Sequence, residues 1–558
     1  MLTEKALEQY RQSDELMILP MGGFGEIGMN MTLFGYKETW FIVDAGVQFC
    51  DASTIGAEVT IQDLDLLKEF KDRISAIFVT HGHEDHIGAI EYVVGILPVP
   101  VYASPFVCEL IKLKASEFGA QNRPDLIPVS PGATVDVGPM TVGFVRVTHS
   151  IPDSHALVID TPTGKVVYSG DFKIDPAPLD GQHFDKQTLK NLGDQGVRLL
   201  LADSTNAMVP GRTSSEQEVI QNLMEIVKQV EGRVIISLFA SNVYRVRALI
   251  EMAHACGRRV ALVGRSLGIY QQAAERAFKL LPPENMVDPH HINRVVDSKI
   301  MVLCTGSQAE PRSALYRASN MDHPDLRIKE GDTVILSSRI IPGNEKAIGR
   351  MTNNLVRLGA HVINEKMAKV HASGHAYRDE LRELLELVRP RTFVPIHGEY
   401  AFMRSHAELA ESCGVNDVRV LENGDLFAVD ETDSTVLKQF PLNFHFVDGP
   451  LVGDAEQLRL SERKRIAWSG VIAANLKATR GRKKWIIKLD VQSVGIPILQ
   501  EGLMDRVADY ALEQVEALPL MASAPDMETC LVMAIRSFFR REMDKKPVVL
   551  PFVEIKEP

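Results

Sequence analysis

The six-residue segment 81–86, HGHEDH, holds three imidazoles and two carboxylates directly after the short apolar segment 76–80. Neutral imidazole and carboxylate are the ligands that zinc and similar divalent ions take in proteins. A solvated polar loop is the structural alternative, but it gives no reason for such a density of ligand-type side chains. The segment therefore predicts a metal site on a loop that follows a strand.

Further His and Asp residues stand where apolar, strand-like segments end. They are Asp44, His149, Asp171, Asp203 and His397. Any one of them alone is typical of a residue that caps or turns the chain. The carboxyl ends of neighbouring strands meet at one edge of the sheet in α/β proteins, so the five together predict a common site beside segment 81–86.

The elements that must position these residues change in character along the chain. The first part is rich in short alternating segments and turns, which predicts strands. From about residue 215 to about residue 370, amphipathic helices alternate with apolar strands, which predicts a parallel α/β unit. Segment 391–400 then returns to a strand that ends in polar residues. The stretch 451–462 has the mixed polar character of a linker, and the remainder predicts a small α+β domain.

Length and charge narrow the class of protein. A chain of 558 residues is too long for one ordinary hydrophobic core, so we expect about two to four domains. The formal net charge of −12 argues weakly against a nucleic-acid partner, because phosphate binding needs cations. A local basic channel can nevertheless lie in an acidic protein.

Cysteine usage and hydropathy bear on the cellular compartment. The six cysteines are scattered and form no CxxC motif, which favours reduced thiols in the cytoplasm. The polar segment 1–16 lacks the apolar run of a secretory signal peptide. Because no apolar stretch of about 18 residues occurs, we expect no membrane-spanning helix and no membrane partner.

Several motifs resemble those of one group of hydrolases. The HGHEDH segment matches the HxHxDH signature of the metallo-β-lactamase superfamily. Segments 371–375 (HASGH) and 395–399 (PIHGE) resemble motifs of the β-CASP nucleic-acid nucleases, and in particular those of bacterial ribonuclease J. The supporting segments are THSIPDS, GDFKID, ADSTNAMVPGRTSSE, FASNVYRVR, TGSQAEP and IPGNEKAIGR. The likeness covers roughly residues 15–450, whereas the C-terminal part is similar only in size and position.

The resemblance implies a fold and its division into domains. The fold is of the α/β class: a metallo-β-lactamase αββα sandwich with an inserted β-CASP α/β domain and a small C-terminal α+β domain. The sandwich would comprise 1–215 and 371–450, and the inserted domain 216–370. A linker over 451–462 would lead to the C-terminal domain at 463–558.

The resemblance also implies two divalent metal ions per chain, Zn²⁺ by preference and Mn²⁺ as the alternative. Seven side chains would hold them in two sets that share Asp171. The first set is His81, His83, His149 and Asp171. The second set is Asp85, His86, Asp171 and His397. Asp44 and Asp203 would orient these ligands from behind.

Catalytic and substrate-binding positions carry over from the same motifs. Asp85, Asp171 and His375 would be catalytic, and His375 would help to protonate the leaving oxygen. A phosphate of the RNA would be bound at a strand-to-helix junction and at the 371–375 loop. These positions are Ala240, Ser241, Asn242, His371, Ala372, Ser373, Gly374 and His375. Helix N-termini bind phosphate through free N–H groups, but simple N-capping explains Ser241 and Asn242 equally well.

The activity implied is metal-dependent hydrolysis of RNA phosphodiester bonds, in which a metal-activated hydroxide attacks phosphorus. It would act as a 5′-to-3′ exonuclease favouring 5′-monophosphate ends and as an endonuclease, in rRNA processing, mRNA decay and other RNA maturation. The expected partners are RNA, further copies of the chain in a homodimer or homotetramer, and other RNA-processing proteins.

Three alternatives stay open. A DNA nuclease of the same group would share the metal site, because recognition of the 2′-OH lies elsewhere. A small-molecule metallohydrolase shares HxHxDH but normally lacks segments like 371–375 and the inserted unit. A non-catalytic RNA-binding subunit is disfavoured because the ligand set is intact.

Overall fold

The computed structural model describes residues 13–50, 54–118, 122–281, 283–284, 286–341, 343–497 and 501–556. The chain divides into two compact units. Met1–Gln48 and Ile61–Asn443 form the first unit, and Phe49–Thr60 and Phe444–Pro558 form the second. Most of the N-terminal segment for which we expect no signal peptide lies outside the described residues. None of the described helices combines the length and the apolar composition that crossing a bilayer requires.

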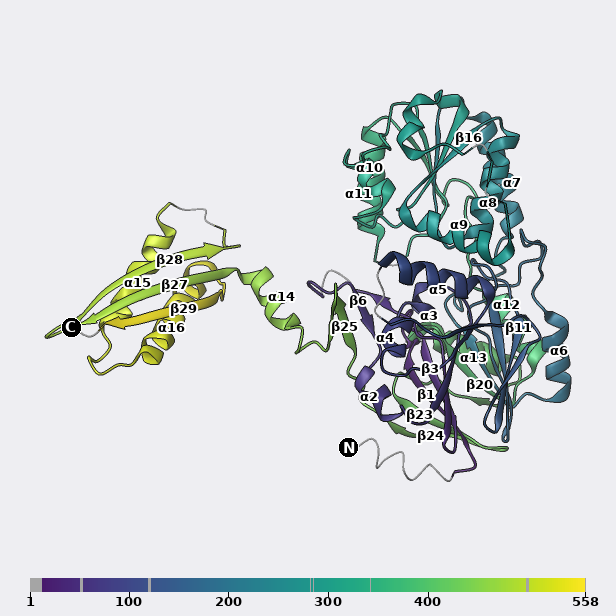
Figure 1. Cartoon of the computed structure of the whole chain (residues 1–558), viewed down its shortest axis with the longest axis horizontal. Coiled ribbons are helices and arrows are strands. Elements are labelled where there is room, and N and C mark those ends of the chain that lie inside the picture. The colour runs from purple at the N-terminus through teal and green to yellow at the C-terminus, as the bar shows by residue number, and fades with distance from the viewer. Residues whose placement is uncertain are drawn as a thin grey trace. The chain divides into compact units, whose positions relative to one another are not determined.

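Two large sheets pack face to face in the first unit (Figure 1). The eight strands of the first sheet are, in spatial order, β24 (Ser434–Gln439), β23 (Asp425–Val429), β1 (Leu16–Gly22), β3 (Met31–Tyr36), β4 (Thr39–Val43), β7 (Ile74–Phe78), β8 (Val101–Ala103) and β9 (Leu126–Pro128). The seven strands of the second are β10 (Thr134–Val137), β11 (Met140–Arg146), β12 (His155–Thr161), β13 (Gly164–Tyr168), β14 (Leu199–Asp203), β20 (Thr392–Ile396) and β22 (Asp417–Val418). A separate short pair joins β2 (Phe24–Gly25) to β21 (Gly398–Glu399).

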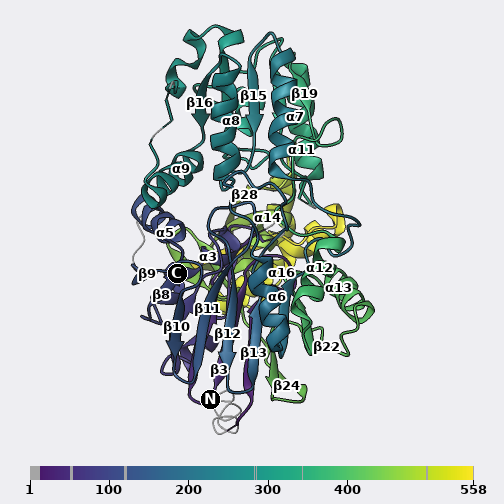
Figure 2. The same ribbon diagram turned by 90° about the vertical axis from the view of Figure 1, so that its right-hand side faces the viewer.

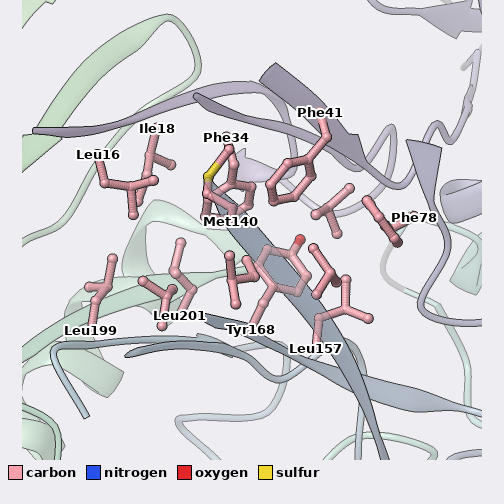
Figure 3. Packing of buried hydrophobic residues seen from close by; sticks show 14 of the residues in the cluster. Leu16, Ile18, Phe34, Phe41, Phe78, Met140, Leu157, Tyr168, Leu199 and Leu201 are labelled. Atoms are coloured by element: carbon pink, nitrogen blue, oxygen red, sulfur yellow. The ribbon is translucent and has the colours of Figure 1, made fainter. Parts of the chain in front are cut away.

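One apolar cluster fills the space between the two sheets (Figure 3). Phe34 and Phe41 of the first sheet stack with their ring centroids 5.5 Å apart. Phe34 also meets the ring of Tyr168, from the second sheet, edge-on at 6.2 Å. All seven residues of β1 are buried, as expected of a strand in a sheet that is covered on both faces. The cluster therefore fixes how the two sheets lie against each other.

Helices cover the outer faces of the sandwich. Their bounds are α2 (Leu64–Glu69), α3 (Glu84–Ile87), α4 (Ile90–Val94), α5 (Pro105–Phe118), α6 (Lys186–Gln195), α12 (Arg378–Val388) and α13 (Tyr400–Ser412). On the second sheet, a separate apolar cluster includes Leu189 of α6, Leu384 of α12 and Leu409 of α13. On the first sheet, Trp40 of β4 packs against Phe70 at the end of α2, with ring centroids 5.0 Å apart. This is the αββα sandwich that the resemblance implies.

Between β14 and β20, which are parallel neighbours in the second sheet, the chain builds a separate α/β unit (Figure 2). Its all-parallel sheet has the order β16 (Arg259–Val263), β17 (Ile300–Cys304), β15 (Val234–Ser237), β18 (Thr333–Leu336) and β19 (His361–Ile363). The helices are α7 (Glu216–Gln229), α8 (Val243–Ala255), α9 (Arg265–Phe278), α10 (Ala314–Ser319) and α11 (Glu345–Arg357), with 3₁₀ turns η1 (Pro289–Arg294) and η2 (Asp297–Lys299). Helices α10 and α11 lie on one side of the sheet and α7 and α8 on the other (Figure 1). We call this the inserted unit.

The second unit contains two small sheets. One has the order β26 (Leu451–Gly453), β25 (His445–Asp448), β6 (Val59–Ile61) and β5 (Gln48–Phe49). In the other, β27 (Val471–Arg480) pairs antiparallel with β28 (Trp485–Val494) and parallel with β29 (Val548–Lys556). The helices are α14 (Leu460–Ser469), α15 (Leu503–Glu516) and α16 (Ala524–Met543). The stretch 451–462 that we predict as a linker thus holds β26 and the start of α14.

The three-stranded sheet of the second unit has two different faces. Buried residues of β27, such as Ile472 and Leu476, share one apolar cluster with residues of α15 and α16. Along β28 the burial alternates after Trp485, so every second side chain is exposed. The face opposite the helices carries the exposed apolar side chains Ile486, Val494, Leu550 and Phe552 among charged ones.

Truncation of Phe34 tests the sandwich core. Phe34→Ala removes a fully buried ring that touches both sheets, so we expect unfolding of the sandwich to cost about 3–5 kcal/mol less. In a background with Trp468→Phe and Trp485→Phe, Trp40 is the remaining tryptophan of the three and reports this transition in urea. The matched control, Phe49→Ala, removes a ring that is 71% exposed and should change stability by less than about 0.5 kcal/mol. Equal effects of the two variants would contradict the assigned core.

Candidate metal centre

The sequence-predicted ligands lie at one edge of the sandwich, because each follows the carboxyl end of a strand. Strands β13, β14 and β20 are parallel neighbours: Asp171 lies three residues after the end of β13, Asp203 is the last residue of β14, and His397 directly follows β20. Strand β11 runs in the same direction as β13, since both are antiparallel to β12, and it leads to His149. In the opposite sheet, β4 and β7 are parallel and lead to Asp44 and to segment 81–86.

The first set of side chains places three ring nitrogens around a common point. The Nδ1 atom of His83 lies 3.1 Å from Nε2 of His81 and 3.0 Å from Nε2 of His149. The Oδ2 atom of Asp171 lies 3.6 Å from Nε2 of His81 and 3.8 Å from Nε2 of His149. The four ligand atoms all lie within 4.8 Å of one another.

The second set lies on the other side of the same carboxylate. Nε2 of His86 lies 3.3 Å from Oδ2 of Asp171, and Oδ2 of Asp85 lies 3.2 Å from Nε2 of His397. The ligand atoms of Asp85, His86, Asp171 and His397 again lie within 4.8 Å of one another. Asp171 is only 3% exposed and belongs to both sets.

Burial keeps the imidazoles of the first set neutral. It lowers the pKa of His83 to about 4, although Asp85 and Asp171 act in the opposite direction. Burial, together with neighbouring imidazoles, also holds the pKa values of His81 and His149 well below the ordinary value. Neutral rings have the lone pairs that a metal ion needs.

The second set has the opposite electrostatic character. Burial lowers the pKa of His397, but Asp171 and other nearby carboxylates outweigh burial and raise it to about 10. The pKa of His86 is likewise raised well above its ordinary value by Asp171, Asp85 and Asp44, against the effect of burial. In the metal-free chain these protonated rings balance the carboxylates, and a bound cation would release their protons.

Each ligand-type imidazole also has a hydrogen-bond partner on its outer nitrogen, the arrangement that fixes the orientation of metal-binding histidines. Asp44 accepts from Nδ1 of His86 (2.8 Å), and its carboxylate also accepts from the hydroxyl of Thr80 (2.9 Å). That Thr80 hydroxyl lies 3.0 Å from Nδ1 of His81. Asp44 itself has a φ of 61°, and the backbone N–H of Thr80 holds its Oδ1 at 2.8 Å.

The other three rings have partners that lie far away in the sequence. Nδ1 of His149 donates to the carbonyl of Gly374 (2.7 Å). Nδ1 of His397 lies 2.8 Å from the hydroxyl of Thr205, and Nε2 of His83 lies 3.2 Å from the hydroxyl of Ser241. Sequence reasoning missed Thr80 and Thr205 as orienting residues, because a Thr beside a motif has no distinctive spacing.

Asp203 and His375 form a separate pair beside the second set. Nδ1 of His375 lies 2.8 Å from Oδ2 of Asp203, whose Oδ1 accepts from the N–H and hydroxyl of Thr205. Asp203, His375, Asp171 and His397 also have ligand atoms within 4.8 Å of one another, so this group overlaps the second set. Burial lowers the pKa of His375, but Asp203 and Asp171 outweigh burial and raise it above the ordinary value.

Two of the predicted phosphate-binding positions contact the first set. The carbonyl of Gly374 lies 2.7 Å from Nδ1 of His149, and the hydroxyl of Ser241 lies 3.2 Å from Nε2 of His83. The side chain of Asn242 caps α8 by accepting from the N–H of Arg245, so the capping interpretation holds for this residue. The hydroxyl of Ser373 accepts from the N–H of His375 (3.1 Å) and from Asn206 (3.0 Å).

Arg245, which sequence reasoning also missed, anchors the start of the 371–375 loop. Its guanidinium is 1% exposed, pairs with Glu216 at 2.8 and 2.7 Å and donates to the carbonyl of Ala372 (3.3 Å). It also lies 3.2 Å from Nδ1 of His371, whose pKa burial lowers to about 3. Ala240, at the end of the junction after β15, is 9% exposed.

Four family models match successive parts of the chain. They are the metallo-beta-lactamase superfamily (residues 25–192), the ribonuclease J beta-CASP domain (231–355), the Zn-dependent metallo-hydrolase RNA specificity domain (361–421) and the ribonuclease J C-terminal domain (458–554). In the solved structures, a protein of unknown function from Enterococcus faecalis shares the fold, with a TM-score of 0.56 and 16% identity over 76% of this chain and 100% of that chain.

Curated relatives match over nearly the full length. The chain is 36% identical to ribonuclease J of Sinorhizobium meliloti over 559 residues, which cover 98% of this chain and 99% of that protein. It is 36% identical to ribonuclease J of Thermus thermophilus over 97% of this chain and 95% of that protein. It is 33% identical to ribonuclease J 1 of Streptococcus pyogenes over 97% and 98%. With these matches and this arrangement of His and Asp residues, the chain belongs to the ribonuclease J family of the metallo-β-lactamase superfamily.

Proposed function

We propose that this chain hydrolyses RNA phosphodiester bonds at a two-metal centre, as a 5′-to-3′ exonuclease favouring 5′-monophosphate ends and as an endonuclease. Its proposed tasks are rRNA processing, mRNA decay and other RNA maturation. The observation that carries the proposal is the carboxylate of Asp171, which belongs to both ligand sets. RNA as the substrate is supported by the family and by the match of residues 361–421 to an RNA specificity domain.

The residues present fit two divalent ions. The inner nitrogens of His81, His83 and His149 face one another, while their outer nitrogens are engaged elsewhere, so the rings are oriented as metal ligands are. The first ion would be held by this trio and Asp171, and the second by Asp85, His86, Asp171 and His397. Imidazole and carboxylate without thiolate suit Zn²⁺, and the carboxylates of the second set also suit Mn²⁺.

The bound ions and the side chains of the protein would have different tasks in the hydrolysis. Two bound ions would supply a hydroxide nucleophile at neutral pH and stabilise charge on the phosphoryl oxygens. Asp203 holds Nδ1 of His375, so Nε2 of that ring is left to donate a proton to the departing 3′ oxygen. Against the effect of burial, the carboxylate of Asp203, 2.8 Å from Nδ1, raises the pKa of His375 and so favours the form of the ring that carries this proton. Asp85 and Asp171 would take part in catalysis as ligands that hold the two ions in place.

A phosphate of the RNA is proposed to lie between the 371–375 loop and the start of α8. The hydroxyl of Ser241 lies 3.2 Å from Nε2 of His83, and the carbonyl of Gly374 accepts from Nδ1 of His149, so both segments reach the first set. We include Ala240 and Ser373 because they adjoin these two residues in the chain. Asn242 contributes as the cap of α8, because its side chain is already engaged. His371 contributes to the proposed phosphate site by its position at the start of the 371–375 loop, where its Nδ1 lies 3.2 Å from the guanidinium of Arg245.

Two other activities remain as alternatives to RNA hydrolysis. A DNA nuclease would use the same ligand sets, so substrate preference alone separates it. A small-molecule metallohydrolase needs neither the inserted unit nor a loop held against His149, and both are present here.

We also propose that the chain associates with further copies of itself and that it is located in the cytoplasm. The three-stranded sheet of the second unit exposes Ile486 and Phe552 on one face, and a homodimer or homotetramer would cover such side chains. Other RNA-processing proteins are further proposed partners. None of the six cysteines, all of which lie among the described residues, forms a disulfide, which fits the cytoplasm that we propose as the location.

Metal content and hydrolysis should fall together when a ligand side chain is removed, whether it belongs to one set or to both. We expect about two divalent ions per wild-type chain, about one in His149→Ala and none in Asp171→Ala, since Asp171 belongs to both sets. Elemental analysis after exhaustive buffer exchange measures this. His183→Ala, which changes an exposed histidine, is the control and should keep both ions. Full activity in protein that contains no metal would refute the two-metal centre.

The same preparations should be tested on end-labelled RNA and DNA of one sequence, with 5′-monophosphate, 5′-triphosphate or 5′-hydroxyl ends. Release of single nucleotides from 5′-monophosphate RNA, together with internal cuts, is the expected result. Preferential cleavage of DNA would favour the alternative nuclease, and no cleavage of either polymer would favour a small-molecule substrate.

His375→Ala should lower kcat by roughly 10²–10⁴-fold, the usual effect of losing a general acid, while the metal content stays unchanged. A substrate with sulfur in place of the departing 3′ oxygen separates this role from others. A thiol ionises near pH 8.5 and leaves without help, so the variant should recover most of its activity on that substrate. An equal loss on both substrates, or loss of metal, would show that His375 has a different role.

The exposed sheet face of the second unit should control self-association. Ile486→Asp combined with Phe552→Asp adds two charges to that face, so light scattering should report a smaller assembly than for the wild type. The control, Val356→Asp, charges a side chain of the inserted unit that is 55% exposed, and the assembly should keep its mass. An unchanged mass in the double variant would place the interface elsewhere.

A further inference from the structure

Five ligand-type imidazoles each have a hydrogen-bond partner on the outer nitrogen. The partner of one of them comes from a different part of the fold than the partners of the other four. Asp44, Thr80, Thr205 and the carbonyl of Gly374 all belong to the sandwich or to the loops that close it. The partner of His83 is Ser241, which lies 158 residues later in the chain, in the inserted unit between β15 and α8. The inserted unit therefore contacts a ligand of the first set directly.

The geometry at His83 assigns its two nitrogens different tasks. Nδ1 faces the nitrogens of His81 and His149 at 3.1 and 3.0 Å, whereas Nε2 lies 3.2 Å from the hydroxyl of Ser241. A neutral ring that offers the lone pair of Nδ1 to a cation must carry its proton on Nε2. The Ser241 hydroxyl is placed to accept that proton in a hydrogen bond.

The position of Ser241 is itself held on both sides. Its carbonyl accepts from the N–H of Val243 (2.8 Å), and the next residue, Asn242, caps α8. Glu216 lies 3.4 Å from the side-chain amide of Asn242 and forms the buried pair with Arg245. Asn242 and Arg245 are almost fully buried, so the backbone that carries the Ser241 hydroxyl is held close to His83.

We propose that Ser241 is a positioning residue of the metal centre, through which the inserted unit completes the first metal site. The proposal rests on the two-metal function proposed above. A hydroxyl has one hydrogen and two lone pairs, so accepting from His83 leaves its hydrogen for a phosphate oxygen. One side chain thus links retention of the first ion to binding of the substrate phosphate.

The test measures metal retention without any substrate. Zn²⁺-loaded Ser241→Ala should give up one of its ions to a competing chelator at roughly 10–100-fold lower chelator concentration than the wild type, the usual effect of removing such a partner. The other ion should be retained as in the wild type, since its ligands do not contact Ser241. Ser241→Thr keeps a hydroxyl and should restore retention.

Controls separate this role from a general loss of structure. Ser237→Ala makes the same substitution four residues earlier, at a buried position of β15, and should leave both ions in place. Melting temperatures of the metal-free proteins should be equal for Ser241→Ala and the wild type. A lower melting temperature of metal-free Ser241→Ala, without rescue by Ser241→Thr, would overturn the proposal in favour of a structural role.

The remaining outcomes distinguish this inference from the proposed function. Unchanged metal retention in Ser241→Ala, with a raised KM for RNA, would overturn the proposal and leave Ser241 as a phosphate contact alone. A wild-type protein that binds fewer than two ions would refute the two-metal function itself, and the inference with it.

Discussion

The buried carboxylate of Asp171 is the constraint on which the rest of the site depends. It faces His81 and His149 on one side and His86 on the other, and it is 3% exposed. Burial raises the pKa of a carboxyl, yet the imidazoles of His397, His86 and His375 hold the pKa of Asp171 below its usual range. An uncompensated charge at this depth would destabilise the fold, so ligands and carboxylate require one another.

The side chains around Asp171 come from the ends of several strands of the sandwich rather than from a single sequence motif. Parallel pairing of β13, β14 and β20 fixes the spacing of Asp171, Asp203 and His397, while the opposite sheet contributes segment 81–86. The core between the sheets sets the separation of these two groups. A change at a core residue such as Phe34 therefore reaches the metal centre through sheet packing.

Buried polar groups connect the loops around this framework. The carboxylate of Glu380 is fully buried and accepts hydrogen bonds from the N–H groups of Ile174 (2.9 Å), Thr213 (2.7 Å) and Tyr377 (3.0 Å). Glu380 thereby ties the segment after Asp171 to the loop that carries His375. In the inserted unit the buried ion pair of Glu216 with Arg245 has the corresponding role, so one side of the proposed phosphate site is held by a hydrogen-bonded carboxylate and the other by an ion pair.

The sequence by itself determined the ligand-type residues, the parallel α/β unit over about residues 215–370 and the strand ends at which those residues lie, whereas the αββα sandwich was implied by the resemblance to a known family. It could do so because ligand density, alternation and strand-to-loop boundaries are local patterns. Only the tertiary structure decided which nitrogen of each ring faces the site and that the hydroxyls of Thr80, Thr205 and Ser241 lie against outer nitrogens of these rings. It also showed β26 and α14 where the composition of 451–462 indicated a linker. These features depend on contacts such as His83 with Ser241, which lie far apart in the chain, and no periodicity or spacing encodes a contact between two segments that only the packed fold brings together.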